Sequence, residues 1–195
     1  MPKVGAIILA AGGSRRFGRP KQLLAFENES LVRRSVRVAT GAGCASVAVV
    51  VGESTTAIKN ELSETSAVMV PNPDWQGGLG TSIRCGLQHL HASVPDLEAV
   101  VIIACDQPFV EASTIAALVA EQERTGQPII ASSYANTLGI PALFDRSCFE
   151  ALLALPDDSG AKTLIESQRG DVAQIEFEQG AIDIDTPADF ERLTS

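Results

Sequence analysis

The sequence predicts an α/β protein of three layers, in which helices cover both faces of a mostly parallel sheet. Continuous apolar runs at residues 6–11, 47–51 and 99–104 are typical of short strands that are buried on both faces. Segments whose apolar residues recur at helical spacing separate these runs. Because strands and helices alternate, each strand is expected to lie parallel to the next, with the intervening helix packed on the sheet.

The same patterns place the elements along the chain. Strands are expected at residues 3–10, 47–51, 67–70, 99–104 and 129–131, with an extended piece at 138–144 that Pro141 interrupts and a short strand at 182–186. Helices are expected at residues 30–40, 55–62, 81–90, 112–123, 147–155 and 160–167, and a last helix begins at Pro187. Ser30 is a candidate N-cap, and Arg33, Arg34 and Arg37 are expected on a solvated helix face.

Length and charge narrow the class of protein. A chain of 195 residues is expected to form one domain over residues 1–195. A net charge of −9 and an isoelectric point near 4.7 argue against a surface for nucleic acid or anionic membranes. The sequence shows no signal segment, so we expect a cytoplasmic protein. Its four cysteines lack C-x-x-C spacing and are expected as reduced thiols in or near the core.

Positive charge gathers behind the first predicted strand. Four of the 15 basic residues, Arg15, Arg16, Arg19 and Lys21, follow the turn at residues 12–14, which reads Gly-Gly-Ser. Glycine lets the backbone approach phosphate oxygens and direct N–H groups at them. Arginine and lysine add charge-assisted hydrogen bonds. We therefore favour a phosphate-binding loop over a surface turn whose cations are merely solvated.

Two well-known phosphate loops do not fit this stretch. A P-loop requires Gly-Lys-Ser or Gly-Lys-Thr, and the sequence contains neither. The dinucleotide fingerprint requires G-x-G-x-x-G at the start of a helix, whereas here Gly12 and Gly13 are adjacent and Gly18 follows late. The loop is therefore of another kind.

The loop resembles the signature of MobA-like nucleotidyltransferases, which begin L-A-A/G-G-x-S/G-x-R-M-G and continue to P-K-x-L. The matching residues are Leu9, Ala10, Ala11, Gly12, Gly13, Ser14, Arg15, Arg16, Phe17 and Gly18, followed by Pro20, Lys21, Gln22, Leu23 and Leu24. The Ala-Ala-Gly form followed by Pro-Lys-Gln-Leu-Leu is most similar to the molybdenum cofactor cytidylyltransferase branch, because related guanylyltransferases usually carry Ala-Gly-Gly. Phe17 stands where the family commonly has methionine, a change that we expect to matter little.

This resemblance implies a Rossmann-like nucleotidyltransferase fold and assigns roles to the loop. Residues 9–15 and Lys21 would bind the nucleotide. Arg16 and Lys21 would act in catalysis, by holding the triphosphate and stabilising charge on the departing pyrophosphate.

Two aspartates are candidate ligands for Mg²⁺. Asp106 follows the apolar run at 99–104, where a carboxylate is either a metal ligand or a helix cap, and the residues alone leave both open. The resemblance favours the metal, because Asp106-Gln107-Pro108 is similar to the family's Asp-x-Pro motif. Asp185 precedes Thr-Pro, as the second metal carboxylate of this fold usually does, although it could also be a cap. Asp183 is expected to point away along a strand, and Asp189 to serve the helix dipole.

A second glycine-rich turn, at residues 77–80, leads into a predicted helix. Its glycines would let the backbone lie against a flat base, and Thr81 or Ser82 could bind the edge of that base. The stretch is similar to the family's base-recognition loop, so Gly80, Thr81 and Ser82 are candidate nucleotide contacts. A glycine turn followed by an ordinary N-cap is the alternative.

Two further places bear on the acceptor. Many family members have Gly-His-Pro near the acceptor pocket, whereas this sequence has Gly139-Ile140-Pro141 and so lacks the imidazole. The stretch at residues 157–162 resembles the family's G-D-x-G-A-R/K element. Lys162 is therefore a candidate contact to the acceptor phosphate, although an exposed helix cation is an equal alternative.

The resemblance implies a Mg²⁺-dependent enzyme that transfers CMP from CTP to the terminal phosphate of molybdopterin and releases pyrophosphate. A molybdoenzyme is a candidate partner, and neither nucleic acid nor membrane is expected to bind. One alternative is the same chemistry with another nucleotide or with a sugar or polyol phosphate as acceptor. Another is a chaperone that hands the cofactor to a molybdoenzyme without catalysis.

Overall fold

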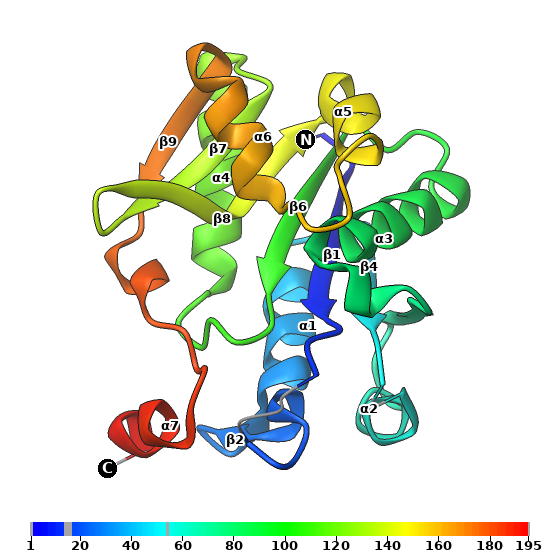
Figure 1. Cartoon of the computed structure of the whole chain (residues 1–195). Helices are drawn as coiled ribbons and strands as arrows, with labels where there is room; N and C mark the ends of the chain where they lie inside the picture. The colour runs from blue at the N-terminus through cyan, green and yellow to red at the C-terminus, as the bar shows by residue number, and fades with distance from the viewer. Residues whose placement is uncertain (1, 14–16, 54, 195) are drawn as a thin grey trace.

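A seven-stranded sheet forms the centre of the molecule in the computed structural model, which describes residues 2–13, 17–53 and 55–194 (Figure 1). Its strand order is β5-β4-β1-β6-β8-β7-β9. The strands are β1 Val4–Ala10, β4 Ser46–Val51, β5 Val68–Pro71, β6 Ala99–Ala104, β7 Ile129–Tyr134, β8 Thr137–Asp145 and β9 Val172–Glu176. A separate two-stranded ladder joins β2 (Ala25–Phe26) to β3 (Glu29–Ser30).

The sheet is mostly parallel, as predicted. The strand β1 pairs in parallel with both β4 and β6, and β4 pairs in parallel with β5. The strand β8 runs antiparallel to β6 and β7, and β9 is parallel to β7. Consequently β1, β4, β5, β6, β7 and β9 all present their carboxyl ends at one edge, where open α/β sheets place their ligands.

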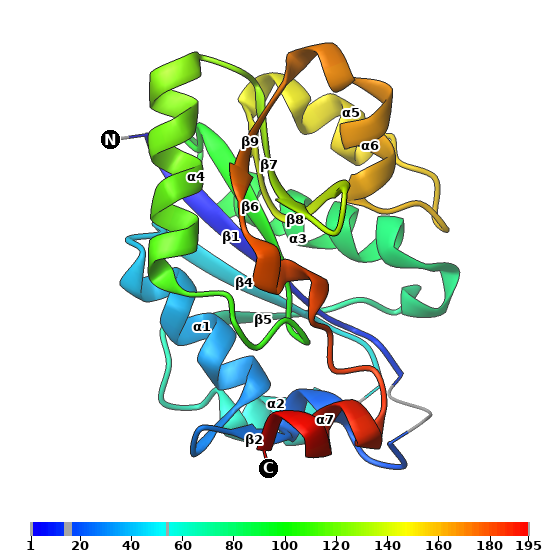
Figure 2. The same ribbon diagram turned by 90° about the vertical axis from the view of Figure 1, so that its left-hand side faces the viewer.

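Helices cover both faces of the sheet, which confirms the three-layer prediction (Figure 2). The helices are α1 Leu31–Gly41, α2 Thr55–Glu61, α3 Leu79–Ser93, α4 Ala112–Thr125, α5 Phe149–Leu153, α6 Ala161–Ser167 and α7 Pro187–Thr194. Side chains of α1 and α4 pack with one face, and those of α3, α5 and α6 with the other. Within β1, Ile8 faces the first layer and Ile7 the second, because successive strand residues point to opposite faces.

Local signals account for most of the element boundaries. Ser30 caps α1, as predicted, because its hydroxyl accepts a hydrogen bond from the backbone N–H of Arg33 at 3.2 Å. The helix α3 begins at Leu79, two residues before the predicted start. All four cysteines are free thiols, and Cys105 and Cys148 are buried. Within the described residues, no helix is long and apolar enough to cross a membrane.

The strand β8 continues through the proline that was expected to interrupt it. Ala131 pairs with Ala142, whereas the next residue of β7, Ser132, pairs with Gly139, so two extra residues of β8 bulge between these pairs. Ser132 donates a hydrogen bond from its hydroxyl to the carbonyl of Pro141 at 2.6 Å. A bulge tolerates proline, since the residue there makes no regular ladder hydrogen bond.

The prediction of a strand at residues 182–186 is wrong. This segment is irregular and lies between a 3-10 turn, Glu178–Ala181, and helix α7. The last strand is instead β9, an edge strand that was not predicted because its side chains are only partly buried and show no clear apolar pattern. Ile184 is buried, but its backbone N–H donates to the carbonyl of Asp106 at 3.0 Å, so the segment crosses the ends of the strands rather than extending one.

Candidate active site

A cavity of about 510 Å³ opens at the carboxyl ends of β1 and β6. The segments after these two strands supply Ala11, Gly12, Lys21, Gln22, Cys105, Asp106 and Gln107 to its lining. The turn before α3 supplies Trp75, Gln76 and Gly78, and the first turn of α3 supplies Leu79 and Ser82. More distant segments supply Tyr134, Ile140 and Asp183. Leu9, Ala10 and Ala104 complete the wall at the strand ends.

A buried side chain holds the backbone of the turn after β1 in place. Gln22 donates from its amide nitrogen to the carbonyl of Ala10 at 2.8 Å and to that of Gly12 at 2.9 Å. Among the residues that the structure describes, no atom lies within 4 Å of a Cβ placed on Gly12. A ligand could therefore approach this backbone closely. The predicted phosphate contacts Ser14, Arg15 and Arg16 lie outside the described residues, and Gly13 does not line the cavity.

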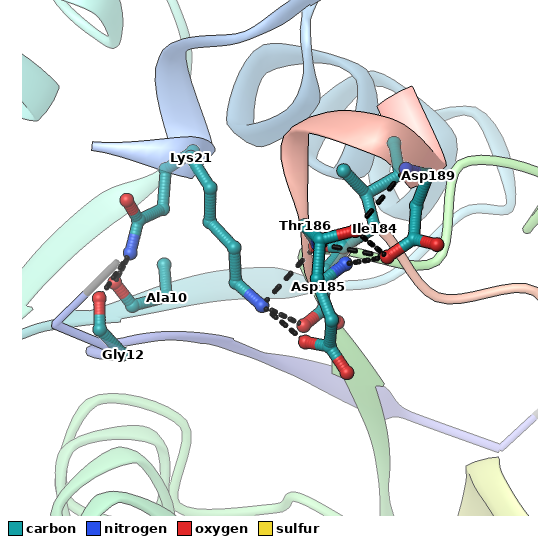
Figure 3. A network of polar contacts seen from close by, with 9 residues as sticks. Ala10, Gly12, Lys21, Ile184, Asp185, Thr186 and Asp189 are labelled. Carbon is teal, nitrogen blue, oxygen red and sulfur yellow. Dashed lines mark hydrogen bonds and ion pairs between the residues drawn. The ribbon is translucent and has the colours of Figure 1, made fainter. Parts of the chain in front are cut away.

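Lys21 joins the two predicted metal carboxylates. Its Nζ lies 2.5 Å from Oδ2 of Asp106, 3.1 Å from Oδ1 of Asp185 and 3.4 Å from the carbonyl oxygen of Ile184. Figure 3 shows Lys21 extending toward Asp185 and Ile184 across the end of the sheet. Burial lowers the pKa of Lys21, but Asp106 and Asp185 outweigh it, so the pKa is raised and the ammonium stays charged. The structure thus brings together three side chains that are widely separated in the sequence.

The two carboxylates differ in how firmly they are held. The side chain of Asp106 is 21% exposed, whereas that of Asp185 is 57% exposed. The backbone of Asp185 is shaped by Asp189, whose Oδ2 accepts from the N–H groups of Asp185 at 3.3 Å and Thr186 at 2.8 Å. Thr186 Oγ1 accepts in turn from the N–H of Asp189 at 3.2 Å, which is a capping box at the start of α7. Asp189 therefore serves the helix terminus, as its place in the first helical turn predicts.

Asp183 belongs to the cavity, contrary to the expectation that it points away. That expectation assumed strand alternation, and residues 182–186 form no strand. Burial, Asp106 and Asp185 together raise the pKa of Asp183 to about 6. Burial and Asp183 also raise the pKa of Tyr134, which keeps its hydroxyl protonated. Neighbouring carboxylates thus give the end of the cavity near residue 183 a negative charge.

Hydroxyl groups at the opposite end are fixed by Asn72. Its buried amide nitrogen donates to Thr81 Oγ1 at 2.8 Å and to Ser82 Oγ at 3.0 Å. Thr81 donates its own proton to the carbonyl of Gly78 at 2.8 Å and does not line the cavity, whereas Ser82 does. Gly80 packs against the segment that follows α5, where a Cβ would lie 2.0 Å from the carbonyl oxygen of Pro156. Direct contact of Gly80 and Thr81 with a nucleotide stays a prediction.

The carboxylates of Asp106 and Asp185 suit a divalent cation that also binds the phosphates of a nucleotide. In residues 2–13, 17–53 and 55–194, no group of three or more histidine, cysteine, aspartate or glutamate side chains is arranged to hold a metal ion by itself. However, one oxygen each of Asp106 and Asp185 already converges on a single cation, Nζ of Lys21. Mg²⁺ is commonly bound by one or two carboxylates together with substrate phosphates, so these two residues match what it requires.

Lys162 pairs with a carboxylate of its own helix. Its Nζ is 3.9 Å from Oε1 of Glu166, one helical turn further along α6, and both side chains are more than half exposed. Lys162 is not among the described residues that line the cavity. Its contact with an acceptor phosphate stays a prediction.

Arg34 contradicts the prediction of a solvated helix face. It is only 6% exposed and donates from Nε to the carbonyl of Pro108 at 2.7 Å. Its terminal nitrogens pair with Glu27 and Glu111, and its guanidinium lies over the ring of Phe26 at 5.4 Å. Arg34 thereby fixes the loop after Asp106 and the β2–β3 turn to the same helix. No local pattern distinguishes it from its neighbours, since its partners come from distant segments.

These features define a class of protein: an α/β protein whose cavity is lined by a glycine turn, a lysine and carboxylates, as binding of a nucleoside triphosphate requires. Residues 6–172 match the family described as the MobA-like NTP transferase domain, and the chain belongs to that family. It is therefore a nucleotidyltransferase of the MobA-like type.

Similar proteins extend over nearly the whole chain. It is 28% identical to nicotine blue oxidoreductase of Paenarthrobacter nicotinovorans, over 99% of this chain and 97% of that protein. It is 29% identical to purine catabolism protein PucB of Bacillus subtilis (strain 168), over 98% and 96% of the two chains. The crystal structure of Rv0371c from Mycobacterium tuberculosis H37Rv has a TM-score of 0.82 at 29% identity and covers 99% of both chains. A structure of Rv0371c in complex with manganese has a TM-score of 0.79 at 27% identity, over 98% and 97%.

We predict that Arg34→Met lowers the free energy of unfolding by about 2 kcal/mol, because hydrogen bonds from a buried charged donor are lost. Urea denaturation measures this change. The control is Arg33→Met, since Arg33 pairs only with the exposed Glu64 in the described network and should change stability by less than about 0.5 kcal/mol. Equal losses in the two variants would show that the Arg34 network contributes nothing specific.

The raised pKa of Asp183 gives a prediction for pH. Its folded-state pKa, about 6, lies above the ordinary value of 3.8, so its contribution to stability is full below 3.8 and is lost as the pH rises through 6. Asparagine does not titrate. The free energy of unfolding of Asp183→Asn, compared with that of the wild type, should therefore be higher at pH 7.5 than at pH 4. Solvent contact of Asp183 will keep the gain small. Urea denaturation midpoints at both pH values measure this gain in stability, with Asp158→Asn as an exposed control. A gain at pH 4 alone would show that the pKa of Asp183 is not raised.

Proposed function

We propose that this protein transfers CMP from CTP to the terminal phosphate of molybdopterin and releases pyrophosphate. One observation supports the transferase chemistry most directly: Lys21, which lines the cavity together with Asp106 and Gly12, contacts the carboxylates of both Asp106 and Asp185. A cation and two carboxylates beside a glycine turn supply what a metal–triphosphate needs. We expect the reaction in the cytoplasm, where nucleoside triphosphates are available.

The proposal of CTP rests on the Ala10-Ala11-Gly12 form of the loop, which resembles the cytidylyltransferase branch. Ala11 and Ser82 both line the cavity, so the residue that distinguishes the branches and a fixed hydroxyl group can face the same nucleotide. We place the base near Trp75, Leu79 and Ser82, because an aromatic ring and a held hydroxyl suit a flat, polar ring.

In the proposed reaction, an oxygen of the acceptor phosphate forms a bond to the α-phosphorus of CTP. The bond from that phosphorus to the β-phosphate oxygen breaks, and pyrophosphate leaves with the electron pair. Lys21 would stabilise the charge that builds up on the leaving group, and the Gly12 backbone would hold the phosphates. Mg²⁺ held by Asp106 and Asp185 would neutralise phosphate charge. The manganese complex of Rv0371c supports a divalent cation in this family fold.

The proposal predicts a specific pattern of substrates and variants. Labelled CTP, GTP, ATP and UTP are each incubated with Mg²⁺ and either molybdenum cofactor or a polyol phosphate. Pyrophosphate should appear with CTP and the molybdenum cofactor. Asp106→Asn should reduce that rate by at least about a thousandfold, because removal of a carboxylate from the metal site removes transition-state stabilisation.

The control for this variant is Asp171→Asn, which lies at an exposed turn before β9 and should keep the wild-type rate. Normal turnover by Asp106→Asn would contradict the metal assignment. Release of pyrophosphate only with the polyol phosphate would show that the acceptor is a polyol phosphate and not molybdopterin. Tight binding of the molybdenum cofactor without release of pyrophosphate would indicate a chaperone.

A second candidate function is suggested by the similarity to nicotine blue oxidoreductase over 99% of the chain. Oxidation of NADH or NADPH in the presence of a quinonoid dye, with no pyrophosphate released from any triphosphate, would favour a reductase. The absence of the dinucleotide fingerprint from the sequence at residues 12–18 weighs against this candidate.

A further inference from the structure

The turn that leads into α3 forms one wall of the cavity and packs against a segment that lies outside the cavity. Trp75, Gly78 and Leu79 belong to this wall. The segment at residues 155–158 follows α5 and contacts the glycines of the turn. None of the described residues that line the cavity belongs to that segment. Its effect on a bound ligand would therefore pass through the turn.

Two glycines of the turn make room for this segment. A Cβ on Gly78 would lie 2.4 Å from the carbonyl oxygen of Asp157, and a Cβ on Gly80 would lie 2.0 Å from that of Pro156. The backbone N–H of Gly80 donates to the carbonyl of Asp157 at 3.0 Å. Gly78 also has a φ of +131°, which side-chain-bearing residues rarely adopt. Close packing of two stretches of backbone thus explains why both positions are glycine.

Arg84 fastens the same segment to α3. One terminal nitrogen of its guanidinium donates to the carbonyl of Leu155, and the other pairs with the carboxylate of Asp157. Arg84 lies four residues after Gly80, so the two residues share a face of the helix. Because the guanidinium is planar and its donors form a fixed fork, two contacts on neighbouring residues fix the segment in both position and orientation.

The ion pair is a feature of this chain rather than of the family element. Asp157 occupies the first position of the stretch at 157–162, where the family element has glycine. Its side chain is 63% exposed, whereas that of Arg84 is 25% exposed. An ion pair with so exposed a carboxylate contributes little to stability. Its consequence is therefore expected in the geometry of the turn.

The turn is also held from the side of the sheet. A Cβ on Gly52, which follows β4, would lie 2.7 Å from Cγ of Trp75, so the indole rests directly on the main chain there. Asn72 holds the hydroxyl groups of Thr81 and Ser82. These contacts lie at residues 52 and 72, before the turn, whereas the contacts of Arg84 reach the segment after α5. Arg84 thus holds the turn from a different part of the chain.

We propose that Arg84 is a positioning residue for the nucleotide. By holding residues 155–158 against α3, it sets the place of the cavity wall that includes Trp75 and Leu79. This inference rests on the proposed function, because it assigns that wall to the base of the nucleotide. Arg84 itself does not line the cavity, so it acts on the ligand through the turn.

The test combines calorimetric titration of the full-length protein with CTP and Mg²⁺ and the fluorescence of Trp75, the single tryptophan of the sequence. Arg84→Met should weaken CTP binding at least about tenfold, because a displacement of about 1 Å misaligns several contacts at once. The emission of Trp75 without ligand should move to longer wavelength as the indole leaves Gly52. Arg84→Lys should lose less affinity than Arg84→Met, because an ammonium still reaches one of the two acceptors.

Arg146→Met is the matched control. Arg146 also donates to main-chain carbonyls, those of Leu97 at 3.4 Å and Pro95 at 3.5 Å, but it lies beside the amino end of β6, away from the cavity. This variant should keep CTP affinity within about twofold and leave the emission of Trp75 unchanged. Urea midpoints of both variants report stability separately from binding.

Three results would overturn the proposal. They are unchanged CTP affinity in Arg84→Met, weaker binding with unchanged Trp75 emission, and an equal loss of affinity in Arg146→Met. Failure of the proposed function looks different. A wild-type protein that binds none of CTP, GTP, ATP and UTP would refute that function, whereas a shifted emission of Trp75 in Arg84→Met alone would still show that Arg84 positions the turn.

Discussion

The contact of Lys21 with Asp106 and Asp185 is the interaction on which the site depends. It joins the segment after β1, the loop after β6 and the irregular segment before α7, which no single element of secondary structure connects. Without a shared cation, Asp106, Asp183 and Asp185 would bring negative charge together in a partly buried place, as the raised pKa of Asp183 indicates. The geometry of the cavity therefore follows from a balance of charge at one point.

The rest of the fold holds that point in position. The apolar strands β1 and β6 pair in register along their length, so the residues that follow them emerge side by side. Arg34 ties the backbone after Asp106 to α1, and the capping box of Thr186 and Asp189 shapes the approach of Asp185. Gln22 holds the turn at Gly12 by a hydrogen bond to the carbonyl of that residue. Each support is a buried or terminal hydrogen bond, so a small displacement in any of them would separate the charged groups.

Sequence alone predicted the parts that depend on local pattern. The buried strands, their alternation with helices, the Ser30 cap and the start of α7 at Pro187 follow from the local sequence. The motif residues Lys21, Asp106 and Asp185 were named from a resemblance, and the structure brings them within hydrogen-bonding distance. The extent of the single domain stays a prediction.

The features that the sequence could not give depend on distant partners. The alternating Ile-Asp-Ile-Asp at residues 182–185 has the period of a strand, but the segment crosses the sheet edge, which also reverses the expected orientation of Asp183. The edge strand β9 has too little buried surface to show a clear pattern. Arg34 resembles its exposed neighbours in the sequence, although Glu27, Glu111 and the carbonyl of Pro108 enclose it in the folded chain.

Binding of Mn²⁺ to the wild type and to Lys21→Met, with and without CTP, is the measurement that most directly tests the central claim. Electron paramagnetic resonance of free Mn²⁺ gives the affinity. Because Lys21 neutralises the same oxygens that a metal would use, its removal should tighten Mn²⁺ binding in the absence of nucleotide at least about tenfold and weaken CTP binding. Unchanged or weaker Mn²⁺ binding by Lys21→Met without nucleotide would contradict a single centre formed by Lys21, Asp106 and Asp185.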